Sequence, residues 1–173
     1  VAAIPVKGSR IETSKAFRVV IRPDADMRAD AIKIHQLRAA DVKNARPMRE
    51  VLPELLAFIG PRPLIGYWID FDCSMLDKSL LAQFNFRLPN RRIEVSKLYF
   101  DRKYGNAPAG TQIDLSFKAI RRDLGIPDLA AHDAFNDALM AAEMYVMLSD
   151  MVARGRRFQR DRVADGALLA AGA

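Results

Sequence analysis

Apolar residues near the start of the chain lie in short β-branched stretches. Residues 1–6 and 16–21 each have the character of a strand, and Lys7-Gly8-Ser9 between them supplies a turn. This pattern predicts two antiparallel strands. Because Val1 is not a methionine and already belongs to a strand-like run, we expect the chain to begin inside a fold, with a further segment upstream.

Further along, the apolar positions alternate between helical repeats and short continuous runs, with a mixture of short helix and loop over residues 24–37. The pattern predicts a helix at residues 48–59, a strand at 64–69, a helix from about 72 to 84, a strand around 92–98, a helix near 114–124 and a long helix from 134 to about 152. Strands followed by alternating helices and strands imply an α/β architecture, a mixed sheet with helices packed on its faces.

Composition limits the size and the setting of this fold. At 173 residues, of which 50% are apolar and 28% charged, the chain has the length of one domain and enough apolar surface for a core. We assign residues 1–153 to that domain. No apolar run reaches membrane-spanning length and no signal peptide opens the chain, so we expect a soluble, cytoplasmic protein. Cys73 is the single cysteine, which we expect to be a buried small hydrophobe.

The net charge of +6 favours polyanionic partners without choosing among nucleic acid, anionic lipid and acidic protein. The excess gathers in residues 154–173, a basic C-terminal tail. Either this tail is solvated and partly disordered, or it contacts phosphate. Its arginines are Arg154, Arg156, Arg157, Arg160 and Arg162.

The segment from His132 to Leu139, at the start of the long helix, carries candidate chemistry. Asp137 near the helix N-terminus could bind a divalent cation, and His132 could accept a proton from an attacking water, because its ordinary pKa lies near neutrality. Alternatively, Asp133 caps the helix, Asp137 is a solvated acid of the first turn and His132 is a loop residue.

A second candidate segment is the apolar run over residues 64–69, which leads into Asp70 and Asp72. A carboxylate at a strand end beside a phosphate substrate is a natural position for a metal ligand. The alternative is that Asp70 or Asp72 simply caps the following helix.

Together these segments resemble the second and third motifs of the DEDDh 3′–5′ exonuclease superfamily, which includes the proofreading epsilon subunit of bacterial DNA polymerase III, RNase T and oligoribonuclease. Phe71-Asp72 with Leu76 matches the second motif, and the span from His132 to Ala138 matches His-Asp-Ala-x-x-Asp-Ala. Weaker likenesses lie at residues 34–37, 93–98 and 124–127, so the resemblance covers about residues 1–148. His35, in the first of these, receives no catalytic role.

The resemblance implies an RNase H-like, mixed five-stranded sheet with helices on both faces, whose central first strand lies upstream of Val1. It also implies a two-metal site for Mg²⁺ or Mn²⁺, with Asp72 and Asp137 as ligands and His132 as general base. The expected activity is removal of nucleotides from the 3′ ends of single-stranded DNA. DNA polymerase subunits are the expected protein partners.

The chain departs from the family pattern at two places. Tyr67-Trp68 stands where the family commonly has His-Asn, and we expect Trp68 to lie in the core in preference to stacking on a base. The first motif, Asp-x-Glu, is absent, and Arg10-Ile11-Glu12 is no substitute for it. We therefore expect these 173 residues to be inactive by themselves. A non-catalytic binding module of the same fold and an RNA 3′ exonuclease are the alternatives.

Overall fold

The protein is described here by a computed structural model that covers residues 1–23, 42–130 and 133–158. The N-terminal segment confirms the antiparallel prediction. Strand β1 (Ala2–Ala3) pairs with β4 (Phe17–Arg18), and β2 (Val6–Lys7) pairs with β3 (Arg10–Ile11). Gly8 closes the β2–β3 turn with a φ of 61°, a left-handed conformation that glycine adopts without a steric cost. A short 3₁₀ helix, η1 (Thr13–Lys15), leads into β4.

Two further ladders are parallel. Strand β5 (Ile21–Arg22) pairs with β6 (Arg46–Pro47), and β7 (Leu64–Gly66) pairs with β8 (Arg92–Glu94). The α/β class with parallel and antiparallel pairing is therefore confirmed. Within the described residues the strands form four separate ladders of two strands each, and not one continuous sheet. The five-stranded sheet with its central strand is therefore not seen in these ranges.

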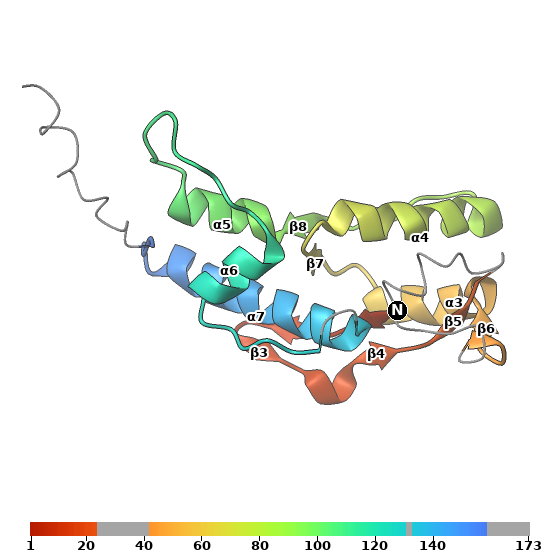
Figure 1. The fold of residues 1–173 in the computed structure, drawn as a ribbon. Coiled ribbons are helices and arrows are strands. Elements are labelled where there is room, and N and C mark those ends of the chain that lie inside the picture. The colour runs from red at the N-terminus through yellow and green to blue at the C-terminus, as the bar shows by residue number, and fades with distance from the viewer. Residues whose placement is uncertain (24–41, 131–132, 159–173) are drawn as a thin grey trace, which may run out of the picture.

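The helices gather in two groups on either side of β7 and β8 (Figure 1). Helices α3 (Met48–Ile59) and α4 (Ile69–Phe84) pack against each other at one end. At the other end, α5 (Val95–Lys103) and α6 (Phe117–Asp123) pack against the long helix α7 (Ala134–Ala153). Helix α7 also contacts β7, β1 and β3, so it ties the N-terminal hairpins to the rest of the fold.

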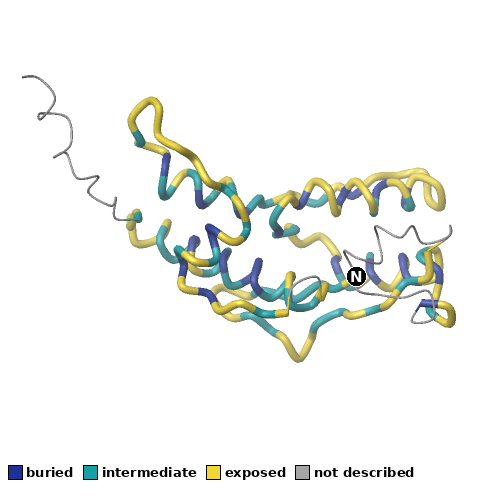
Figure 2. The backbone as a smooth tube through the Cα atoms, viewed as in Figure 1, coloured by how far each residue is buried: buried dark blue, intermediate teal, exposed yellow. Residues whose placement is uncertain are grey.

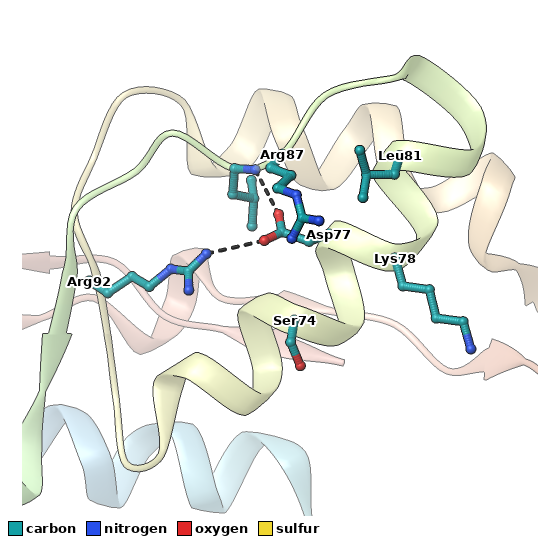
Figure 3. A pocket seen from close by; sticks show the side chains of 7 residues that line it. Ser74, Asp77, Lys78, Leu81, Arg87 and Arg92 are labelled. Atoms are coloured by element: carbon teal, nitrogen blue, oxygen red, sulfur yellow. Dashed lines mark hydrogen bonds and ion pairs between the residues drawn. The ribbon is translucent and has the colours of Figure 1, made fainter.

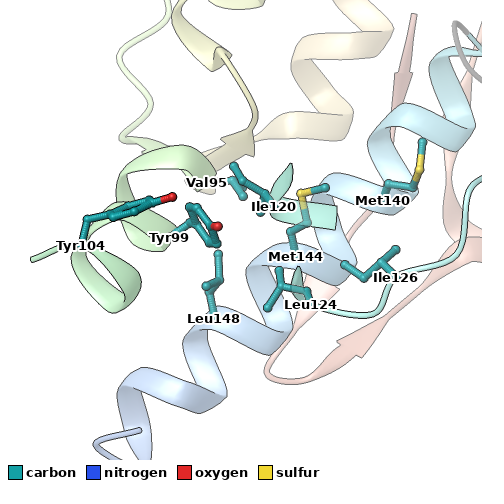
Figure 4. Packing of buried hydrophobic residues seen from close by; sticks show 9 residues of the cluster. All are labelled: Val95, Tyr99, Tyr104, Ile120, Leu124, Ile126, Met140, Met144 and Leu148. Carbon is teal, nitrogen blue, oxygen red and sulfur yellow. The ribbon is translucent and has the colours of Figure 1, made fainter. Parts of the chain in front are cut away.

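The larger core cluster lies between α5, α6 and α7 (Figure 4). Met144 and Leu148, one helical turn apart on α7, are fully buried against Tyr99 and Ile120. Burial of such side chains contributes roughly 1.5–3 kcal/mol each. The long helix predicted at residues 134–152 is confirmed to within one residue, and its buried positions lie between Met140 and Leu148.

A second cluster joins α3 and α4, where buried stretches of the two helices face each other (Figure 2). Cys73 belongs to it and is 1% exposed, which confirms the expectation of a buried small hydrophobe. The buried members are Leu52, Ile69, Cys73, Leu80 and Leu88. The predicted helix at residues 48–59 matches α3.

Two predicted strands extended too far, and the helix expected near residues 114–124 is shorter, at Phe117–Asp123. The strand expected at residues 64–69 ends at Gly66, and α4 already begins at Ile69, so Asp70 and Asp72 lie in the first helical turn and not at a strand end. The strand expected at residues 92–98 ends at Glu94 and continues as α5. The segment from Val95 to Leu98 has apolar residues only at its two ends, and so short a pattern is ambiguous between strand and helix.

The start of the basic tail packs back onto the domain. Arg154 and Arg156 both pair with Asp150 on α7, and Arg157 donates to the Asp101 carbonyl oxygen at 3.1 Å. The Phe158 ring lies edge-on to Tyr99 with centroids 5.2 Å apart. None of the helices in the described ranges combines the length and the apolar character that crossing a bilayer requires.

Candidate active site

The connection between β7 and α4 turns sharply at Trp68. This residue has φ 56° and ψ 37°, a left-handed conformation that is a genuine outlier for a bulky side chain. Strain of this kind gathers at functional sites, where the surrounding structure holds it in place. The indole is 68% exposed and stacks on Tyr67, with ring centroids 5.8 Å apart and an interplanar angle of 9°. The expectation that Trp68 lies in the core is therefore wrong, because the left-handed turn directs its ring to the surface.

Tyr67 anchors this aromatic pair to the domain. Its hydroxyl donates to the Leu115 carbonyl oxygen at 3.2 Å, and its ring meets Phe117 edge-on with centroids 5.1 Å apart. Burial raises the pKa of the Tyr67 hydroxyl above its ordinary value. The Trp68 indole therefore stands on a base that is fixed by packing and by a hydrogen bond.

Glu94 fixes the entry of the chain into α4 and α5. Its Oε2 accepts a hydrogen bond from the Ile69 backbone N–H at 3.1 Å, while its Oε1 accepts from the Ser96 N–H at 3.0 Å and the Ser96 hydroxyl at 2.8 Å. One carboxylate thus satisfies free N–H groups at the starts of two helices, where a negative charge also suits the helix dipole.

Asp72 lies beside this cap, in the first turn of α4, with an exposed side chain. Partial desolvation raises the pKa of its carboxyl, and the negative charge of Glu94 raises it further. Asp72 forms no salt bridge with any residue in the described ranges. A bound cation would relieve the repulsion between these neighbouring carboxylates.

Asp137 lies in the first turn of α7, so both proposed acidic ligands sit at helix starts. Asp133 is the N-cap of that helix and accepts hydrogen bonds from the Phe135 N–H at 2.9 Å and the Asn136 N–H at 3.0 Å, which confirms the capping role that the sequence offered for it. The Arg18 guanidinium lies 4.2 Å from the centroid of the Phe135 ring and links β4 to the start of α7.

His132 and His35 lie outside the described residues. The role of His132, and the convergence of Asp72 with Asp137, stay predictions. Within the described ranges, no three acidic, histidine or cysteine side chains come together as a metal cluster. Asp72 and Asp137 nevertheless supply carboxylate oxygens, the ligand type that Mg²⁺ and Mn²⁺ prefer.

Sequence reasoning missed Glu94, which was assigned to a strand. A signal was present, because an acid two residues before Ser96 can cap a helix that starts at Val95. Its second bond, to Ile69, joins residues 25 positions apart and has no sequence signal.

Comparison with known proteins identifies the family of this chain. Residues 1–145 match the RNase_T family model, described as an exonuclease. DNA polymerase III subunit epsilon of Rickettsia prowazekii is 27% identical over 143 residues, which are 82% of this chain and 61% of that protein. The Rickettsia felis subunit is 26% identical over the same length, with the same coverage. The chain thus spans about three fifths of the length of these relatives.

A solved structure shares the fold. Exonuclease X in complex with 5′ overhanging duplex DNA superposes with a TM-score of 0.62 at 20% identity, covering 89% of this chain and 82% of that one. This likeness supports the RNase H-like fold expected from the sequence. Since the family model extends over most of the chain, the protein belongs to the RNase_T exonuclease family.

Proposed function

We propose that this protein is the core of a metal-dependent 3′–5′ exonuclease that removes nucleotides from the 3′ ends of single-stranded DNA. The observation that carries the proposal is Asp72: an exposed carboxylate with a raised pKa, in the first turn of α4 and without a salt bridge in the described part of the chain. A stability role would favour pairing this charge, whereas a cation-binding role requires it to be open.

Asp72 and Asp137 would hold Mg²⁺ or Mn²⁺ through carboxylate oxygens. Ions held there would supply activation of the attacking water and charge stabilisation of the leaving oxygen in phosphodiester hydrolysis. His132 accepts the proton of the attacking water. These 173 residues lack Asp-x-Glu, so we propose the activity for a protein in which that motif accompanies this chain, and we expect residues 1–173 alone to be inactive.

Exposed aromatic faces beside Asp72 suit a single-stranded substrate. Trp68 and Phe71 are 68% and 64% exposed, and bases stack on such rings without regard to sequence. The names of the relatives, a DNA polymerase subunit and an exonuclease bound to DNA, favour DNA over RNA and make polymerase subunits the expected partners. The absence of Asp-x-Glu favours a second candidate, a non-catalytic binding module of the same fold.

The test compares the full-length protein with Asp72→Asn and Asp137→Asn variants on 3′-labelled and 5′-labelled single strands of DNA and RNA in Mn²⁺. We expect stepwise shortening of DNA from the 3′ end, and a loss of about 10²–10⁴-fold in each variant, because metal-assisted charge stabilisation contributes several kcal/mol. Asp128→Asn, an exposed acid on the α6–α7 connection, is the matched control. Binding without cleavage would instead establish the non-catalytic module. Preference for RNA would change the proposed substrate from DNA to RNA.

A further inference from the structure

The segment after α4 turns back and is held against that helix. Asn85 ends α4 with a φ of 56°, which reverses the chain direction. Asp77, 4% exposed, accepts a hydrogen bond from the Leu88 N–H at 2.7 Å and pairs with Arg92 at 3.2 Å (Figure 3). These bonds fix residues 85–92 beside the second half of α4.

The surface formed by α4 and this segment carries uncompensated positive charge. Lys78, Arg87 and Arg91 are exposed, and none of them pairs with an acid in the described ranges. Arg92 is the cation that binds the nearby carboxylates, Asp70 at 2.9 Å and Asp77. Lys78, Arg87 and Arg92 line an open hollow of about 480 Å³, in which the Asp77 charge is already engaged (Figure 3).

Exposed apolar side chains lie next to these cations. Leu81, Phe84 and Phe86 are 37%, 40% and 39% exposed, and the two phenyl rings stand 6.0 Å apart. Phe84 follows Asp77 by seven residues and therefore lies on the same face of α4. Leu81 itself lines the hollow. The surface thus combines cations with exposed apolar side chains, two of which are aromatic.

We propose that this surface, made of Lys78, Leu81, Phe84, Phe86 and Arg87, binds a stretch of single-stranded nucleic acid away from the reacting end. Phosphates would contact Lys78 and Arg87, and bases would stack on Phe84 and Phe86. Single-strand binding sites combine a positively charged track with aromatic stacking groups in this way. An acidic protein segment would use the charges, whereas a single strand offers a base for stacking beside every phosphate.

The surface lies further along α4 than Asp72 and on another side of that helix. Asp72 and Phe84 are twelve residues apart on one helix, which corresponds to about 18 Å along its axis. Leu81 follows Asp72 by nine residues and lies half a turn around the helix, so a strand that reaches both must cross α4 obliquely. The identity of the ligand rests on the proposed function, whereas the surface itself does not depend on catalysis.

The test is the binding of a fluorescein-labelled 20-nucleotide oligo(dT) to the full chain in EDTA, followed by anisotropy at several salt concentrations. Lys78→Glu/Arg87→Glu should weaken binding at least about tenfold and lower the salt slope by about 1.4, since each lost single-strand phosphate contact removes about 0.7. Phe86→Ala should weaken binding about tenfold with little change in the slope.

The control is Lys7→Glu/Arg10→Glu, which makes the same change in net charge on the exposed β2–β3 hairpin. Circular dichroism verifies folding, and Lys78→Gln/Arg87→Gln, which adds no acid, should still lower the slope. Equal loss in the control, or unchanged binding in the α4 variants, overturns the proposal. Because EDTA prevents metal-dependent cleavage, selective loss supports the surface even if the parent protein proves to be no nuclease.

Discussion

Glu94 at the end of β8 accepts a hydrogen bond from the Ile69 N–H at 3.1 Å, so the last residue of one strand caps the helix that follows its neighbour. The same carboxylate caps α5 through Ser96. The parallel pairing of β7 with β8 places Gly66 opposite Glu94 and brings these helix starts together. The position of Asp72, one turn into α4, depends on this cap.

Removal of the shared cap should destabilise the fold. We expect Glu94→Ala to lower the free energy of unfolding by about 1–2 kcal/mol in total, the usual effect of losing an N-cap. Both helices contribute to this loss, because the carboxylate caps each of them. Glu94→Gln keeps one carbonyl oxygen as an acceptor and should lose less stability than Glu94→Ala. Urea unfolding of both variants checks this order, and equal stability of parent and Glu94→Ala would contradict it.

Tyr99, Lys103 and Asp123 form a hydrogen-bonded group between α5 and α6. The buried Tyr99 hydroxyl donates to Asp123 Oδ2 at 2.6 Å, and Lys103 contacts both side chains. Tyr99→Phe should cost about 1–3 kcal/mol in urea unfolding, since a charged acceptor loses a donor. Burial raises the pKa of Tyr99, and its bond to Asp123 raises it further, so this contribution should be complete below about pH 10 and should fall progressively as the pH rises from there through the folded-state pKa.

The fall in the free energy of unfolding at low pH should depend on Asp123. Burial alone would raise the pKa of its carboxyl, but hydrogen bonds from Lys103 and Tyr99 lower it below the ordinary value. A lowered pKa in the folded state gives stability that is present above about pH 4 and is lost as the pH falls through the folded value. Asp123→Asn should therefore flatten the acid side of the stability profile measured by urea unfolding. An unchanged slope would exclude this coupling.

Two substitutions of Trp68 distinguish the effect of backbone strain on stability from the effect of the indole on substrate binding. Trp68→Ala should weaken the binding of single-stranded DNA by about 1–3 kcal/mol, because one stacking surface is lost. Trp68→Gly should lose the same binding but exceed Trp68→Ala in stability by about 1 kcal/mol, because glycine adopts the left-handed conformation without a steric cost. Fluorescence anisotropy and thermal unfolding give the two measurements, and full binding by Trp68→Ala would remove Trp68 from the substrate site.

His132 distinguishes catalysis from metal binding. In the full-length enzyme, His132→Ala should reduce the single-turnover rate by about 10²–10⁴-fold with little change in Mn²⁺ affinity, because the carboxylates remain. The parent rate should rise with pH through the range where histidine titrates, and this rise should vanish in the variant. A purely structural histidine would instead lower stability and Mn²⁺ binding together with activity.

The sequence by itself determined the class of the fold and most of its helices. The apolar repeats in α3 and α7 extend over three or more turns, so their helical period is unmistakable and they match the predicted ranges. The order of motifs around Asp72 and Asp137 was sufficient to indicate the exonuclease family, which the family match confirms.

Only the tertiary structure decided where the short elements end and which way their side chains face. Residues 92–98 are compatible with a strand or a helix, and the hydrogen bonds of Glu94 select α5 from Val95 onward. The large apolar side chain of Trp68 suggests a core residue, yet the turn between β7 and α4 places its ring at the surface. Such choices depend on contacts between residues far apart in the chain, which local periodicity does not record.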